Sequence, residues 1–336
     1  MELLEKITEV ALKTGADVVG VASMDRFDSF PMQQNPRYIM PEAKSMIVLG
    51  HRTMRGSFRG AEEGTFLSHY PAMGIGYVKK DIVPLTARAV CCLIEDMGKE
   101  AMPIGDHFAW AAINDDGTLK KRHSVPVREG LPAPDVRFNM TYAAYLAGLG
   151  EIGYSGQLLH PKYGPRLIFG CVLTELELPA SPVIAPGTLC SRCKKCCEEC
   201  PGGCISATET DTLTLGGYTF EIGKYDPEKC AVACTGSEFT EDGSYKPSKY
   251  SPFYKKPGPV PPFGNGIICA GRGCIRACMI ELEENKRITN LFDAPFRRHP
   301  AWEVDWEGYE SGRLVNDTVP PNGQDQVKRN INDIDE

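Results

Sequence analysis

The spacing of apolar residues divides the first 180 residues into alternating helices and strands. Apolar positions recur at helical spacing over residues 1–13, and short apolar runs at Asp17–Ser23 and Ser45–His51 predict buried strands. The further elements predicted in this way are a helix at Val78–Met97, a hairpin around Asn114–Gly117, a short helix at Tyr142–Ala147 and a strand at Arg166–Glu175. This mixture predicts an α/β or α+β fold for residues 1–180.

The composition changes at Pro179–Gly187, where prolines cluster directly ahead of a cysteine-dense segment. Because prolines and glycines mark linkers, we predict three parts: residues 1–180, residues 181–290 and a polar tail at 291–336. A long ordered loop is expected between Thr235 and Gly266. The last stretch, Asn316–Glu336, either frays or clasps another subunit, and a homodimer is therefore left open.

Length and charge narrow the classes of function. The chain has 336 residues and a formal net charge of −7, which disfavours a surface built to neutralise many phosphates. No stretch reaches the roughly 20 apolar residues that span a bilayer. The acidic N-terminal helix differs from an export signal, so we expect a cytoplasmic protein, with a nucleic acid or a membrane as an unlikely partner.

The cysteines point to metal. Most of the 14 lie between Cys190 and Cys278, and the run CSRCKKCCEECP has the C-x2-C-x2-C-x3-C-P spacing of bacterial ferredoxins. In that pattern three thiolates hold one 4Fe–4S cluster and the fourth holds a second cluster. The predicted ligands of the first cluster are Cys190, Cys193, Cys196 and Cys278.

A second cysteine group is therefore required. By the pseudo-symmetry of ferredoxins its ligands are Cys200, Cys230, Cys269 and Cys274. Cys234 competes with Cys230 as the remote ligand, while Cys197 and Cys204 are left over as packed thiols. The alternative is a pair of four-cysteine zinc sites, but zinc sites do not usually have this spacing. Two clusters predict an oxygen-sensitive electron-transfer protein.

The segment Thr141–Leu178 (TYAAYLAGLGEIGYSGQLLHPKYGPRLIFGCVLTELEL), followed by the ferredoxin motif, resembles the family that contains epoxyqueuosine reductase and the reductive dehalogenases. The resemblance implies a nitroreductase-like corrinoid-binding domain, then a ferredoxin-like domain with two clusters. It also implies a base-off cobalamin whose cobalt is reduced to Co(I) beside the substrate. The residues that the resemblance implies for cofactor binding are Arg137, Gly148, Leu149, Gly150, Glu151, Gly153, His160 and Tyr163.

The glycine turn has more than one interpretation. Gly148, Gly150, Gly153 and Gly156 leave a backbone without side chains that a large planar ligand can approach. The literal match to G-x-G-x-x-G suggests a dinucleotide, but a helix precedes it where a Rossmann turn requires a strand. An ordinary turn without ligand is the third possibility. His160 is a tempting cobalt ligand, although its place before Pro161 favours a structural cap.

A reduction driven by single electrons also needs a proton donor. Tyr77 opens the second long helix, where the resemblance implies a pocket aromatic. Asp135 lies within one residue of the position of the catalytic aspartate of epoxyqueuosine reductases, and Tyr154 follows the glycine turn. Tyr77 ranks first because a phenol stays protonated at neutral pH, whereas Arg137 would hold Asp135 ionised.

Together these features predict an oxidoreductase: a corrinoid-dependent iron–sulfur reductase that removes a halide, an oxygen or a similar group from a small molecule. Its electrons would come from a low-potential donor such as a ferredoxin or a flavodoxin. The first alternative is an electron carrier or corrinoid activator with no substrate of its own. The second is tRNA modification like that of epoxyqueuosine reductase.

Overall fold

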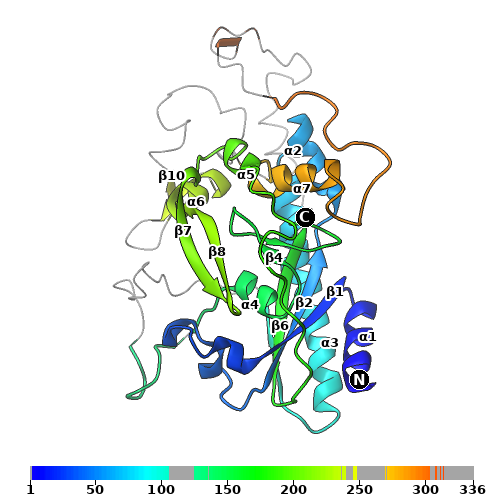
Figure 1. Cartoon of the computed structure of the whole chain (residues 1–336), viewed down its shortest axis with the longest axis vertical. Coiled ribbons are helices and arrows are strands. Elements are labelled where there is room, and N and C mark those ends of the chain that lie inside the picture. Colours follow the sequence, from blue (N-terminus) through cyan, green and yellow to red (C-terminus); the bar gives the residue numbers. More distant parts are fainter. Residues whose placement is uncertain are drawn as a thin grey trace, which may run out of the picture. The chain divides into compact units, whose positions relative to one another are not determined.

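A four-stranded sheet organises the N-terminal half of the computed structural model, which describes residues 2–105, 125–134, 136–235, 237–239, 245–247, 269, 271–302, 307–308, 311 and 313. The strands follow the order β1 (Val18–Ser23), β2 (Ser45–Arg52), β6 (Leu167–Thr174) and β3 (Ala101–Ile104) (Figure 1). Each neighbouring pair is antiparallel. The predicted mixture of helices and strands is confirmed, and three predicted strands lie within one residue of their expected ends.

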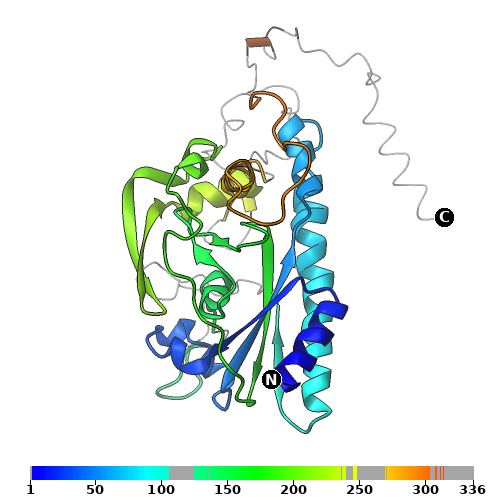
Figure 2. The same cartoon turned by 45° about the vertical axis from the view of Figure 1, so that its right-hand side comes forward.

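Helices cover both faces of this sheet. Ile47 and Leu49 of β2 pack in one apolar cluster with α1 (Glu2–Lys13) and α3 (Val83–Glu95). The alternate residues Met46 and Val48 pack in a second cluster with α4 (Met140–Leu146), as the period of two along a strand requires. Figure 2 shows α1 and α3 side by side on their face of the sheet. The N-terminal half therefore has three layers.

The second long helix differs from its prediction. It is π-helical over Tyr70–Gly76 and Val78–Ile82 and becomes α-helical only in α3, which ends at Glu95. The predicted range Val78–Met97 is wrong at both ends, because the π-helical turns extend it backward and Met97 lies beyond the last α-helical turn. Because π-helical turns are frequent at functional sites, this helix is a candidate for function.

The short helix α4 begins two residues earlier than predicted. The Asn139 side-chain oxygen accepts hydrogen bonds from the backbone N–H groups of Thr141, at 2.9 Å, and Tyr142, at 3.3 Å. An asparagine in this position satisfies the free N–H groups of the first helical turn. The glycine turn follows α4 and leads into two short paired strands, β4 (Glu151–Ile152) and β5 (Leu158–Leu159).

The cysteine-bearing half contains a long hairpin that the apolar pattern did not predict. Its strands are β7 (Ile205–Leu215) and β8 (Tyr218–Tyr225), joined at Gly216 and Gly217 with φ of 58° and 83°. A tight hairpin turn of this kind requires positive φ at both central residues. The hairpin packs on α4 through a ring contact between Phe220 and Tyr145, with centroids 5.1 Å apart.

Three helices and one further strand pair complete the described residues of this half. They are α5 (Lys195–Glu198), α6 (Pro227–Thr235) and α7 (Cys274–Glu284), with β9 (Ser237–Phe239) paired to β10 (Tyr245–Pro247). Among the described residues, no helix combines the length and the apolar character needed to span a membrane.

The chain divides into one unit of Met1–Arg298 and a short one of His299–Glu336. The expected boundary near residue 180 lies inside the first unit, and the division into a corrinoid part and a cluster part stays a prediction. The hairpin around Asn114–Gly117, most of the loop expected between Thr235 and Gly266, and the tail Asn316–Glu336 lie outside the described residues.

Candidate metal centre

The first cysteine group forms where a tight loop meets α7. The loop carries Cys190 and Cys193 and curls through positive φ at Arg192 (57°) and Lys194 (62°), and Cys196 follows on α5. Cys278 on α7 faces this loop: burial raises the pKa of its thiol well above the ordinary value, and Cys190, Cys196 and Cys193 raise it further. The four cysteines predicted for the first cluster are therefore close neighbours.

The second cysteine group draws on three parts of the chain. Cys200 follows α5 and Cys230 lies on α6. Cys269 lies five residues before Cys274, which is the first residue of α7. Burial, together with the nearby Cys269, Cys200 and Cys230, raises the pKa of Cys274 to about 12. The four ligands predicted for the second cluster thus also face one another.

The donor sets suit clusters better than single ions. Within the parts of the chain that the structure describes, no group of three or more His, Cys, Asp or Glu side chains could hold one metal ion. A single zinc ion would draw four thiolates to about 2.3 Å from one point. An iron–sulfur cube binds each thiolate to a different iron and so requires a wider group of thiolates than a single ion does.

Two more thiols lie in the second group. Cys234, one helical turn after Cys230, has its sulfur 3.9 Å from the Cys230 sulfur. Cys204 is buried, and its backbone N–H donates to the Cys200 sulfur at 3.4 Å. Hydrogen bonds from Cys204 and Cys234 lower the pKa of Cys230, which favours its thiolate. In the first group the remaining thiol, Cys197, lies 3.6 Å from the carbonyl oxygen of Ser206.

Glu151 fixes the start of the first cysteine loop. Its side chain is 1% exposed, and its two carboxylate oxygens accept hydrogen bonds from the backbone N–H groups of Gly187, Leu189 and Cys190. A carboxylate that accepts several backbone N–H groups makes strong, oriented contacts. Both oxygens thus accept hydrogen bonds from the chain itself, which gives Glu151 a positioning role. Its contact with a cofactor stays a prediction.

A buried ion network joins the two cysteine motifs. Arg276, between Cys274 and Cys278, pairs with Glu62 at 2.9 Å and with Glu199 at 3.3 Å. Arg297 pairs with the same two carboxylates, at 2.9 Å to Glu62 and 2.8 Å to Glu199. Glu199 directly precedes Cys200 and Glu62 belongs to α2 (Arg59–Glu63). The network therefore ties both motifs to one another and to the N-terminal half.

The glycine turn is filled by the chain's own atoms. A Cβ at Gly148 would lie 2.4 Å from the Pro182 carbonyl oxygen, one at Gly150 2.3 Å from that of Leu159, and one at Gly153 2.9 Å from the Leu159 side chain. The chain's own atoms therefore occupy the Cβ side of these three glycines, and the approach of a planar ligand to this turn stays a prediction. At Gly156 a Cβ would meet no described atom within 4 Å.

The other residues implied for the corrinoid lie in three settings. His160 accepts hydrogen bonds at Nδ1 from the backbone of Lys162 and Tyr163, and burial lowers its pKa to about 4; this is the cap that the sequence favoured. Tyr163 stacks on the His160 ring. Leu149 is buried in the sheet core, and Arg137 is exposed. Their contact with a corrinoid stays a prediction.

The three proton-donor candidates also differ. Tyr77 is 48% exposed and stands between the two π-helical segments. Tyr154 packs against Cys196, its hydroxyl donates to the Ser206 carbonyl oxygen at 3.0 Å, and its backbone N–H donates to the Cys190 sulfur at 3.3 Å. Tyr154 therefore packs against the first cysteine group. Asp135 lies outside the described residues.

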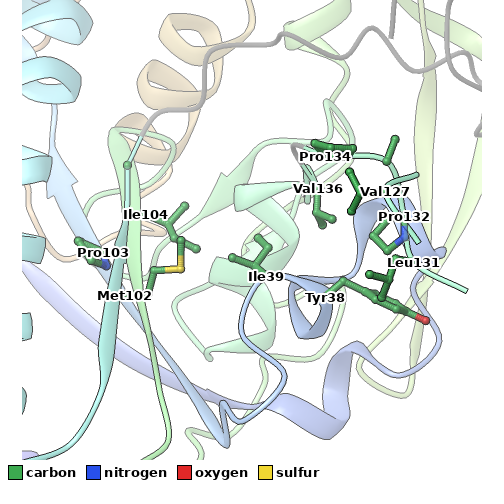
Figure 3. Close-up of a pocket in the computed structure, with 12 residues that line it drawn as sticks. Tyr38, Ile39, Met102, Pro103, Ile104, Val127, Leu131, Pro132, Pro134 and Val136 are labelled. Carbon is green, nitrogen blue, oxygen red and sulfur yellow. The ribbon is translucent and has the colours of Figure 1, made fainter. Parts of the chain in front are cut away.

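An apolar pocket of about 520 Å³ opens beside the segment that contains Asp135 (Figure 3). Pro134 and Val136, on either side of Asp135, both line it. Figure 3 shows Tyr38 and Ile39 opposite Met102 and Ile104 of β3. The sequence signal for this pocket is the apolar run Leu131–Pro134, which lies between two predicted elements and lines the pocket.

Comparisons with known proteins bear on the resemblance. No family model matches the chain. A tetrachloroethene reductive dehalogenase of Dehalobacter restrictus (strain DSM 9455 / PER-K23) is 34% identical over 137 residues, which are 40% of this chain and 21% of that protein. An epoxyqueuosine reductase of Synechococcus sp. (strain RCC307) is 40% identical over 60 residues, 18% of each chain. The chain thus matches about a fifth of the length of these relatives, and the resemblance to both is confirmed.

Two solved structures that align with the chain are a reductive dehalogenase and an epoxyqueuosine reductase. A catabolic reductive dehalogenase in complex with 3-bromo-4-hydroxybenzoic acid aligns with a TM-score of 0.46 and 18% identity, covering 89% of this chain and 40% of that one. An epoxyqueuosine reductase from Streptococcus thermophilus aligns with a TM-score of 0.39 and 14% identity, covering 91% of this chain and 69% of that one.

Proposed function

We propose that this chain is a cytoplasmic oxidoreductase that carries two 4Fe–4S clusters and a corrinoid and reduces a small molecule, with removal of a halide, an oxygen or a similar group. The observation that carries the proposal is the assembly of eight cysteines into two groups of four, each group drawn from segments far apart in the sequence. Relatedness to reductive dehalogenases and epoxyqueuosine reductases supports the same class of chemistry.

The cluster part of the proposal has direct support in the donor set. The first cluster would take Cys190, Cys193, Cys196 and Cys278, and the second would take Cys200, Cys230, Cys269 and Cys274. Backbone N–H groups of Tyr154 and Cys204 donate to the sulfurs of Cys190 and Cys200, and such hydrogen bonds tune cluster potentials. Thiols persist in a reducing compartment, which favours the cytoplasm.

The corrinoid part rests on the resemblance. When bound, the group would supply a cobalt centre that is a strong reductant and nucleophile. We assign residues 1–180 to corrinoid and substrate and residues 181–290 to electron transfer. A low-potential ferredoxin or flavodoxin is the proposed donor.

We assign the apolar pocket of Figure 3 to the substrate. Its lining is dominated by aliphatic side chains and prolines, with Tyr38 as an aromatic wall, and pockets of this kind bind small, largely apolar molecules. A halogenated aromatic or alkene fits that lining. The net charge of −7 argues for a small molecule ahead of a tRNA.

The deciding experiment is anaerobic purification with corrinoid supplied, followed by iron, cobalt and zinc analysis and electron paramagnetic resonance (EPR). The proposal expects about eight irons and about one cobalt per chain, with the signals of two reduced 4Fe–4S clusters. Iron without cobalt would instead favour the electron carrier, and about two zinc ions would favour four-cysteine zinc sites. Turnover of an epoxyqueuosine-containing tRNA, with no turnover of organohalides, would favour the tRNA alternative.

The proton donor is tested separately in loaded enzyme once a substrate turns over. Tyr77→Phe and Asp135→Asn are compared with wild type in single-turnover reductions. Tyr154→Phe is the matched control, because its hydroxyl is occupied by the Ser206 carbonyl oxygen. We expect the largest loss for Tyr77→Phe. Full rates in the first two variants, with both clusters and the corrinoid intact, would place the donor elsewhere.

A further inference from the structure

Helix α6 presents two cysteines to the same corner of the second group. Cys230 and Cys234 are four residues apart, which places them on one helix face. Their sulfurs lie 3.9 Å apart, in the geometry of a hydrogen bond in which either thiol can be the donor. Both sulfurs therefore lie at one corner of the second group.

Both sulfurs also face the rest of the second group. Cys230 contacts Cys204, and Cys234 contacts Cys269. Cys234 is exposed at the surface, whereas Cys230 is partly buried. A cluster built on Cys200, Cys269 and Cys274 would thus meet two thiols at its fourth corner, where it needs only one.

We propose that Cys230 and Cys234 are interchangeable ligands of one iron of the second cluster. This inference rests on the proposed function, because it assumes that a 4Fe–4S cluster occupies the group. A cluster in this group would bind the thiolate of one of the two cysteines while the other stayed protonated, so an exchange of ligand would move one proton between the two sulfurs. One iron–sulfur bond forms and one breaks, and no electron is gained or lost.

Cys204 is in a different position from this pair. It is 3% exposed, and a Cβ on Gly202 would lie 2.7 Å from its sulfur. The sulfur is therefore enclosed by neighbouring chain and serves as a hydrogen-bond partner of Cys200 and Cys230. In the first group, Cys197 directly follows Cys196 on α5, and its sulfur contacts both the Cys196 side chain and the Ser206 carbonyl oxygen.

The test uses alanine variants of the full chain, because serine can itself bind iron. Iron content and EPR spectra of anaerobically purified Cys230→Ala, Cys234→Ala and the double variant are compared with Cys197→Ala as the matched control. We expect about eight irons in each single variant, with altered second-cluster signals in Cys230→Ala. The double variant should keep about four irons and the unchanged signal of the first cluster, which also shows that it folds.

Two results would overturn the inference while the proposed function stands. A fall to about four irons in Cys230→Ala alone would make Cys230 a fixed ligand. Retention of eight irons in the double variant would place the fourth ligand outside α6. Wild-type protein that binds zinc, or no iron at all, would instead refute the proposed function itself.

Discussion

The two cysteine groups are built in different ways. The first takes three ligands from seven consecutive residues, Cys190–Cys196, and adds Cys278 from α7. The second takes Cys200 from the same motif, Cys230 from α6, and Cys269 and Cys274 from one loop, and it holds two additional thiols. A local loop can specify the first group almost alone, whereas the second depends on the folding of α6, α7 and the hairpin between the motifs. The first group should therefore be the more robust.

Helix α7 is the element that the two groups share. It supplies Cys274 to the second group and Cys278 to the first. Its residue Arg276 lies between them and is held by Glu62 and Glu199. Damage to one ligand should stay within its own group, while damage to the network should reach both.

The largest expected effect comes from the two cysteines of α7. Cys278→Ala should remove the first cluster and Cys274→Ala the second, so that each variant retains about four of about eight irons. Iron analysis and EPR under anaerobic conditions check this, since the two variants should lose different signals. Loss of the same signal in both variants would contradict the division into two groups.

The next effect is expected from Arg276→Gln, which removes one cation from the buried network. Breaking a buried ion pair on one side typically costs about 3–5 kcal/mol, and the side chains of Arg276 and Glu62 are only 3% and 5% exposed. Thermal unfolding should move to lower temperature, and both clusters should become labile together. Lys195→Gln is the control: that lysine pairs with Glu281 but is 42% exposed, so its loss should cost below about 1 kcal/mol.

Gly271→Ala should weaken the second group alone. Gly271 has φ of +79°, and a Cβ there would lie 2.6 Å from the Cγ of the buried Tyr70 ring. Left-handed backbone costs about 1–2 kcal/mol in a residue with a Cβ, and overpacking adds about 1–3 kcal/mol. Chelator-driven iron release should accelerate for the second cluster only.

The matched control for this prediction is Gly203→Ala. Gly203 also has positive φ, +56°, but a Cβ there meets no described atom within 4 Å. Gly203→Ala should lose the stability that a left-handed backbone costs a residue with a Cβ, without the clash with Tyr70. Equal iron release in the two variants would mean that the Tyr70 contact does not support the Cys269–Cys274 loop.

The elements that could be predicted from the sequence are those that depend on neighbouring residues in the chain. Apolar runs predicted β1, β2 and β6, and the cysteine spacing predicted both groups. Gly216–Gly217 and the alternation of threonine and leucine in Thr212–Leu215 are typical of a hairpin. The β7–β8 hairpin was nevertheless not predicted, because its strands are rich in threonine and other polar residues. The ion network could not be predicted, since Glu62 and Arg297 are 235 positions apart and meet only in the folded chain.

Glu151 is the clearest case of a residue whose role only the fold reveals, and it gives the prediction with the smallest effect. In Glu151→Gln an amide NH2 replaces one carboxylate oxygen. Because one oxygen accepts from Gly187 and the other from Leu189 and Cys190, the NH2 group must face at least one backbone N–H in either orientation. A buried donor left without its acceptor costs about 1–3 kcal/mol.

This cost should fall on the first group, because Cys190 begins its loop and Glu151 holds the backbone there. We expect faster loss of the first cluster to a chelator and an unchanged second cluster, measured by EPR over time. Glu198→Gln makes the same chemical change at an exposed position of the same motif and should leave both rates unaltered. Equal loss of both clusters in Glu151→Gln would mean that Glu151 supports the fold as a whole, and the first group would then depend on long-range contacts as much as the second.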